Sequence, residues 1–152
     1  MKNALFSFVR GVCYLQKRIT AYFWHWYQVN YCLANNVRFL DRSTVKFNNR
    51  AYISINPKSN VLIGKAFYMN SGPESGIGTT MSKITVSEGA TLQIGDYAGI
   101  SSTTILVKNS VTIGNHVNVG GAVLSMTATT IVPIGVIVLT GSTMCKMPRL
   151  LQ

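Results

Sequence analysis

Apolar residues recur every six positions over most of the sequence, and this repeat constrains the fold more than any other feature. The repeat is interrupted at residues 69–83 and shifts by one position near Thr104. Its members are Ile55, Val61 and Phe67 with Ile63 and Met69; Val86, Leu92 and Ala98 with Ile94 and Ile100; and Ile105, Val111, Val117 and Val123 with Val107, Ile113 and Val119. Apolar residues two apart indicate short β-strands that alternate inward and outward side chains. A strand that restarts every six residues must turn a corner between repeats.

Small and polar residues occupy the positions between these short strands. The most specific units are "IGKAFY" (63–68), "IGDYAG" (94–99), "IGNHVN" (113–118) and "VGGAVL" (119–124). A six-residue internal repeat is typical of a parallel β-helix, in which equivalent residues of successive coils stack. We therefore predict an all-β solenoid over residues 36–122, preceded by an N-terminal α-helix. Residues 69–83, which break the repeat, are predicted to form an excursion loop, where solenoids often place binding groups.

Residues 1–35 form a separate N-terminal region with helical spacing. An apolar stripe recurs at threes and fours, comprising Leu5, Phe8, Val9, Val12, Leu15, Ile19 and Phe23. One interpretation is a helix that packs on its own domain or on a neighbouring subunit, which the few charges of the polar face favour. The other is an interfacial helix whose residues 4–27 contact an anionic membrane surface. A spanning helix is not predicted, because polar residues interrupt the uncharged run from Ile19 to Val37.

The charge and cysteine content narrow the choice of partners. A net charge of +10 results from 14 Lys and Arg against only four Asp and Glu. Most of the bases precede Lys65 and form no basic and aromatic stripe of a nucleic-acid module, so we expect no nucleic acid partner. Three scattered cysteines without a CxxC spacing indicate neither a metal site nor a disulfide framework. We expect a cytoplasmic protein, at the inner face of the membrane if the helix binds lipid.

Three stretches resemble the hexapeptide-repeat O-acyltransferases, and especially the sugar and polysaccharide acetyltransferases. They are "IGKAFYMNSG", "ITVSEGATLQIGDYAGISSTTI" and "VTIGNHVNVGG", and the resemblance covers roughly residues 50–121. It implies a left-handed parallel β-helix, which is an exception to the right-handed crossover rule. It also implies a homotrimer with active sites between subunits, acetyl-CoA as the acyl donor, and a hydroxyl of a sugar or surface glycan as the acceptor.

The same resemblance suggests which residues bind the acceptor. These candidates are Asn70, Ser71, Ser101 and Ser102. The alternative for all four is a structural role at corners or on the outer strand surface.

The general base of the family is a histidine in a pattern like Asp-Ser/Thr-Asp-x-His. The matching stretch here, "VLSMTATTIV" (123–132), contains neither His nor Asp. The expected histidine is therefore absent near Thr130, and no catalytic residue is assigned. His116 is predicted to be a solvated corner residue, with a substitute base role as the weaker alternative. His25 is predicted to pack within an aromatic cluster.

Residues 123–152 form an apolar tail in which the repeat is lost. One interpretation is a slip of reading frame: suitable third bases in the codons from Ser125 onward would spell Tyr-Asp-Ser-Asp-Tyr-His in another frame. The missing histidine would then be encoded across Thr130 and Ile131. The other interpretations are a membrane segment, which Pro133 and Gly135 would interrupt, and a genuine final coil with an apolar contact between subunits. A slip would remove later coils and much of the site for CoA.

The sequence thus predicts an acetyl-CoA-dependent O-acyltransferase fold in a chain that turns over little or not at all. The alternative function is that of a non-catalytic β-helical structural or binding protein. A flat threonine-lined face, as in ice-binding solenoids, is disfavoured because the outward threonines are irregularly spaced.

Overall fold

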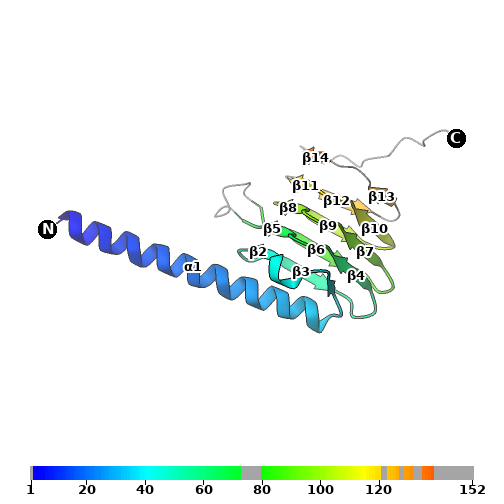
Figure 1. Cartoon of the computed structure of the whole chain (residues 1–152), viewed down its shortest axis with the longest axis horizontal. Coiled ribbons are helices and arrows are strands. Elements are labelled where there is room, and N and C mark those ends of the chain that lie inside the picture. Colours follow the sequence, from blue (N-terminus) through cyan, green and yellow to red (C-terminus); the bar gives the residue numbers. More distant parts are fainter. Residues whose placement is uncertain (1, 73–79, 121–122, 127–128, 132–134, 139–152) are drawn as a thin grey trace.

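The computed structural model describes residues 2–72, 80–120, 123–126, 129–131 and 135–138 (Figure 1). Within these residues the chain forms one long α-helix, α1 (Lys2–Ala34), and three parallel β-sheets. A short 3-10 helix, η1 (Arg42–Thr44), lies between the first two strands and is capped by the Asp41 side chain. The predicted N-terminal helix is therefore confirmed.

Each sheet contains every third strand of the described chain, and all pairs are parallel. The first sheet has the order β1 (Arg38–Phe39), β4 (Asn60–Ile63), β7 (Thr91–Ile94), β10 (Ser110–Ile113) and β13 (Thr129–Ile131). The second has the order β2 (Lys46–Asn48), β5 (Tyr68–Asn70), β8 (Gly99–Ser101), β11 (Val117–Gly120) and β14 (Gly135–Val138). The third has the order β3 (Tyr52–Ile55), β6 (Lys83–Val86), β9 (Thr104–Val107) and β12 (Val123–Met126). This arrangement is consistent with the predicted parallel β-helix.

The core consists of equivalent residues stacked in register from strand to strand. In the first sheet, Val61 pairs with Leu92 and Leu92 pairs with Val111. Every member of the predicted repeat from Ile55 to Val119 is at most 5% exposed, which confirms the inward series. Stacking of branched aliphatic side chains keeps the interior free of polar groups, so burial stabilises each added strand.

The corners between the first and second sheets are held by a ladder of side chains. The Lys65 N–H donates to Asp96 Oδ1 at 2.7 Å, and the Asp96 N–H donates to Asn115 Oδ1 at 2.8 Å. At Gly64 a Cβ would lie 2.5 Å from the carbonyl carbon of Gly95, so the backbones approach too closely for any other residue. The glycines and the Asx side chains of the repeat are therefore structural.

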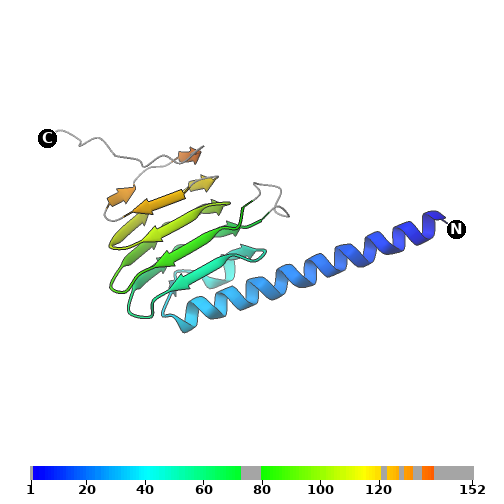
Figure 2. The same cartoon turned by 180° about the vertical axis from the view of Figure 1, so that it is seen from behind.

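The C-terminal part of α1 docks on the edge of the second sheet, beside β2 (Figures 1 and 2). The Gln28 Nε2 amide donates to the Asn49 carbonyl at 2.8 Å, and the Phe47 N–H donates to His25 Nδ1 at 3.2 Å. On the docked side of the helix, the side chains of Val29 and Cys32 are buried, and burial raises the pKa of the Cys32 thiol to about 12. The helix thereby covers backbone groups that an edge strand would otherwise expose.

Two predicted boundaries differ from the structure. Met69 and Asn70 belong to β5 and Lys83 begins β6, so the excursion is shorter than 69–83, and residues 73–79 lie outside the described part. The sheets also continue past residue 122, because β12, β13 and β14 pair in parallel with β9, β10 and β11. Because the six-residue repeat is lost in the tail, the repeat did not predict these strands. The expected site of the missing histidine, Thr130, lies in β13.

Candidate functional site

Two of the predicted acceptor residues belong to a column of polar side chains on the second sheet. Asn48 pairs with Asn70, and Asn70 pairs with Ser101, in the parallel register. The Asn48 Nδ2 amide donates to Asn70 Oδ1 at 2.7 Å, and the Asn70 Nδ2 amide donates to Ser101 Oγ at 3.3 Å. The amide of Asn70 is thus engaged by its neighbours above and below.

The other two predicted residues close the excursion loop. The Ser71 hydroxyl donates to the Arg50 carbonyl at 2.6 Å and accepts from the Ser82 N–H at 3.0 Å. The Ser102 N–H donates to the Asn70 carbonyl at 3.3 Å, and Ser102 adopts a left-handed backbone with φ of 48°. The structure therefore brings Asn70, Ser71, Ser101 and Ser102 together, all at most 8% exposed. Their contacts support the structural alternative more than direct acceptor binding.

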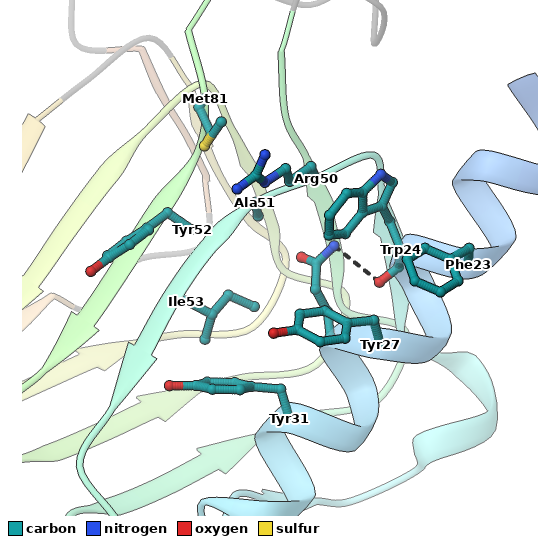
Figure 3. A pocket seen from close by; sticks show the side chains of 10 residues that line it. Phe23, Trp24, Tyr27, Tyr31, Arg50, Ala51, Tyr52, Ile53 and Met81 are labelled. Carbon is teal, nitrogen blue, oxygen red and sulfur yellow. Dashed lines mark hydrogen bonds between the residues drawn. The ribbon is translucent and has the colours of Figure 1, made fainter.

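A cavity of about 470 Å³ lies between α1 and the third sheet (Figure 3). One wall comes from α1 and the other from residues 50–53 with Met81. The side chains that line it are Phe23, Trp24, Tyr27, Gln28, Tyr31, Arg50, Ala51, Tyr52, Ile53 and Met81. A smaller adjoining cavity of about 260 Å³ shares Trp24, Arg50 and Met81 with it and is lined also by Ser71. We call the larger space the aromatic cavity.

The aromatic cavity combines flat apolar faces with a few polar groups. Tyr27 stacks on Tyr31 with ring centroids 6.5 Å apart, and the Arg50 guanidinium lies 5.2 Å from the Trp24 ring centroid. Gln28 is 2% exposed, and its Oε1 is the single buried side-chain oxygen or nitrogen in the described residues without a hydrogen-bond partner. Rings, phenolic hydroxyls and one cation suit a polar ligand with an apolar face, since a tyrosine or tryptophan offers both characters.

The aromatic cavity was not predicted from the sequence. Its two walls are separated by about 20 residues of chain and meet only because α1 docks on the sheet edge. The sequence feature that could have indicated the cavity is the cluster of aromatic residues between Tyr22 and Tyr31, in a helix predicted from the sequence either to pack on the protein or to contact a membrane.

Neither described histidine faces the predicted acceptor residues as a general base. The exposed His116 ring stacks on Tyr97 with centroids 4.9 Å apart, at a corner of the β-structure. His25 lies on the helix, with its Nδ1 accepting from the Phe47 N–H and its ring 6.3 Å from that of Phe47. His25 therefore packs, as predicted, and His116 is an exposed corner residue, as predicted.

The pKa of His25 is lowered from its ordinary value by desolvation and by the nearby Arg42 guanidinium. Because the unfolded chain then binds the proton more readily, the free energy of unfolding should fall as the pH decreases below the ordinary histidine pKa of about 6.5. Protonation also removes the acceptor that Nδ1 offers to Phe47. Urea unfolding between about pH 7.5 and pH 5.5 measures this slope.

A His25→Asn variant keeps an acceptor and removes the titrating ring, so we expect its stability to depend less on pH. His116→Asn, which removes the other histidine of the sequence, is the matched control and should retain the slope. An unchanged slope in His25→Asn would contradict the assignment.

Among the described residues, no group of three or more His, Cys, Asp or Glu side chains is arranged to hold a metal ion. Comparisons with protein-family models, with curated proteins and with solved structures find no match to this chain. Any function must therefore be argued from the residues themselves.

Proposed function

We propose that this chain is a left-handed parallel β-helix of the hexapeptide acyltransferase type that binds a sugar or glycan and transfers acyl groups poorly or not at all. In this proposal it assembles as a homotrimer, and the acyl donor of the fold is acetyl-CoA. The aromatic cavity is the observation that carries the binding part. The part that concerns turnover rests on the described residues of the cavity lining, among which there is no histidine or carboxylate to act as a base.

The lining of the aromatic cavity fits a pyranose better than a wholly apolar or a strongly charged ligand. The C–H face of a sugar ring can pack on the half-exposed rings of Tyr27 and Tyr52, while its hydroxyls bond to phenolic oxygens or to Arg50. A hydroxyl donor close to Gln28 would also supply the hydrogen bond that Oε1 lacks. The described residues of the lining include no carboxylate, so they offer no counter-charge to a cationic ligand.

Poor turnover follows from the chemistry of acyl transfer. A sugar hydroxyl must lose its proton as it attacks the thioester, and a positioned base supplies typically about 10²–10⁴-fold of the rate. Among the described residues, no histidine or carboxylate lines either the aromatic cavity or the cavity that adjoins it. The chain should therefore bind an acceptor without activating it.

Tryptophan fluorescence can test the binding part. In a Trp26→Phe variant, Trp24 in the cavity is the only tryptophan left in the sequence. We expect pyranosides such as glucose, galactose or N-acetylglucosamine, added one by one, to change its emission in a saturable way. Tyr27→Ala in this background should weaken binding by about tenfold, equivalent to roughly 1.4 kcal/mol.

Tyr22→Ala, a tyrosine truncation outside the aromatic cavity, is the matched control and should leave the affinity unchanged. Equal loss in both variants, or no saturable response to any sugar, would contradict the proposed site. Release of CoA from acetyl-CoA with the same sugars should stay at the rate without protein. Steady turnover would contradict the proposal of a disabled transferase.

A further inference from the structure

The N-terminal part of α1 extends beyond the strands, and the helix exposes an apolar stripe (Figures 1 and 2). Its large apolar side chains are each about half exposed or more: Phe8, Val12, Leu15, Ile19, Phe23 and Trp26. Phe8, for example, is 70% exposed. Their spacing of three and four residues places them on one side of the helix. From here on, the name apolar stripe refers to these six residues, which share five members with the stripe described from the sequence.

Apart from Phe23, which also lines the aromatic cavity, the apolar stripe lies on the side of α1 that is turned away from the β-structure. Where the helix docks, Gln28 and Cys32 are 2% and 1% exposed and face the strands. In the same segment Trp26 and Leu33, which follow Ile19 by seven and fourteen residues, remain 54% and 38% exposed. Residues seven apart share a helix face, so the stripe continues on the outer side along the whole helix.

The helix crosses the end of the stacked strands instead of running along the stack (Figures 1 and 2). A flat surface can therefore touch the stripe over its full length while the strands stay on the opposite side. At ~1.5 Å per residue, the segment of α1 from Phe8 to Trp26 corresponds to about 30 Å of such contact. This geometry suits a planar partner.

The charges of α1 favour an anionic partner. The helix contains Lys2, Arg10, Lys17 and Arg18 and no acidic residue. Tyr14, Tyr22 and Trp26 add exposed aromatic side chains of the kind enriched at membrane–water interfaces. Over the residues that the structure describes, no helix has both the length and the apolarity needed to cross a bilayer. The combination is that of a helix that lies on a lipid surface.

We propose that the apolar stripe of α1 docks on the surface of an anionic lipid bilayer. A second copy of the chain is the competing occupant, because the spacing also resembles a coiled-coil seam. Coiled coils pair through complementary charges beside the seam, and a helix without acidic residues offers none to its own copy. An anionic lipid surface attracts the net positive charge that the four bases give the helix, without requiring each base to lie beside the stripe.

Co-sedimentation of the full chain with vesicles tests this proposal. We expect binding to phosphatidylcholine vesicles containing phosphatidylglycerol, weak binding to phosphatidylcholine alone, and a loss of binding as salt is raised from about 0.05 M to about 0.5 M. Ile19→Glu should reduce binding by about tenfold or more, because it places a carboxylate on the lipid side. Equal binding to both kinds of vesicle would overturn the proposal.

Cys13→Glu is the matched control, since Cys13 is exposed on the same helix but lies off the apolar stripe. It introduces the same charge and should reduce binding much less than Ile19→Glu. In a Trp24→Phe chain, Trp26 is the remaining tryptophan and its emission should shift to the blue on anionic vesicles. The absence of a shift would overturn the proposal. Sedimentation analysis that shows self-association without lipid, abolished by Ile19→Glu, would assign the stripe to a second copy instead.

Discussion

Replacing Gly95 by alanine should destabilise the protein by about 3 kcal/mol, near the upper end for overpacking of a rigid interior. The added Cβ would lie 2.4 Å from Asn115 Oδ1, 2.6 Å from the carbonyl carbon of Gly114 and 2.7 Å from the Asn115 nitrogen. Two of these atoms are backbone, so the next coil must shift to make room. The shift would also break the hydrogen bond from the Asp96 N–H to Asn115, a further cost of about 1 kcal/mol.

Thermal and urea unfolding measure this effect. For a chain of this size, each kcal/mol of lost stability lowers the midpoint temperature of thermal unfolding by roughly 2–4 °C. Gly120→Ala is the matched control, because its Cβ would meet only the Ser101 carbonyl oxygen at 3.9 Å, an ordinary contact. Against the described residues, the expected change in stability is about 0.5 kcal/mol or less. Equal effects of the two substitutions would mean that the coils do not approach as closely at Gly95 as the structure describes.

Truncating Phe67 to alanine should cost about 3–5 kcal/mol. Phe67 is fully buried at 0% exposure, and its ring meets that of Phe47 edge to face with centroids 5.9 Å apart. Both phenylalanines belong to the first coils of the β-structure, where α1 docks, so the cavity left by the truncation lies in the part that the helix covers. Little room is available for neighbouring side chains to collapse into it.

Phe8→Ala provides the same truncation at an exposed position of α1 and should change stability by about 0.5 kcal/mol or less. Circular dichroism during urea unfolding compares the two variants. A loss below about 1 kcal/mol for Phe67→Ala would contradict its place in the core.

The inward residues were predictable because the repeat is local. Leu92 and Val111 follow from spacing alone, and so do the corner glycines, since both depend on what a short strand and a tight corner require. The docking face of α1 was not predictable in this way. Gln28 and Cys32 face the strands although the strongest apolar stripe of the helix lies elsewhere, so the helical pattern indicated the wrong side for packing on the β-structure.

The same limit applies to the candidate site. The four predicted acceptor residues do come together, yet their hydrogen bonds hold the column and the loop. The aromatic cavity depends on a long-range contact between α1 and residues 50–53, which no periodicity encodes. In the tail, strands β12 to β14 need only backbone groups to pair with the coil before them, so they form without the glycine and asparagine corners of the repeat.

Parallel pairing of each strand only with its predecessor and successor in the stack has a consequence for evolution of the chain. Backbone pairing couples each coil mainly to its immediate neighbours, and the hydrogen bond that the Tyr68 hydroxyl donates to Asn118 Oδ1 at 2.5 Å, across Gly99, reaches one strand further along the second sheet. Substitutions, or even a different number of coils, at the far end can therefore accumulate while the helix, the aromatic cavity and the first coils keep their geometry. Most of the energetic coupling between the end that holds the aromatic cavity and the opposite end must therefore pass through the coils that lie between them.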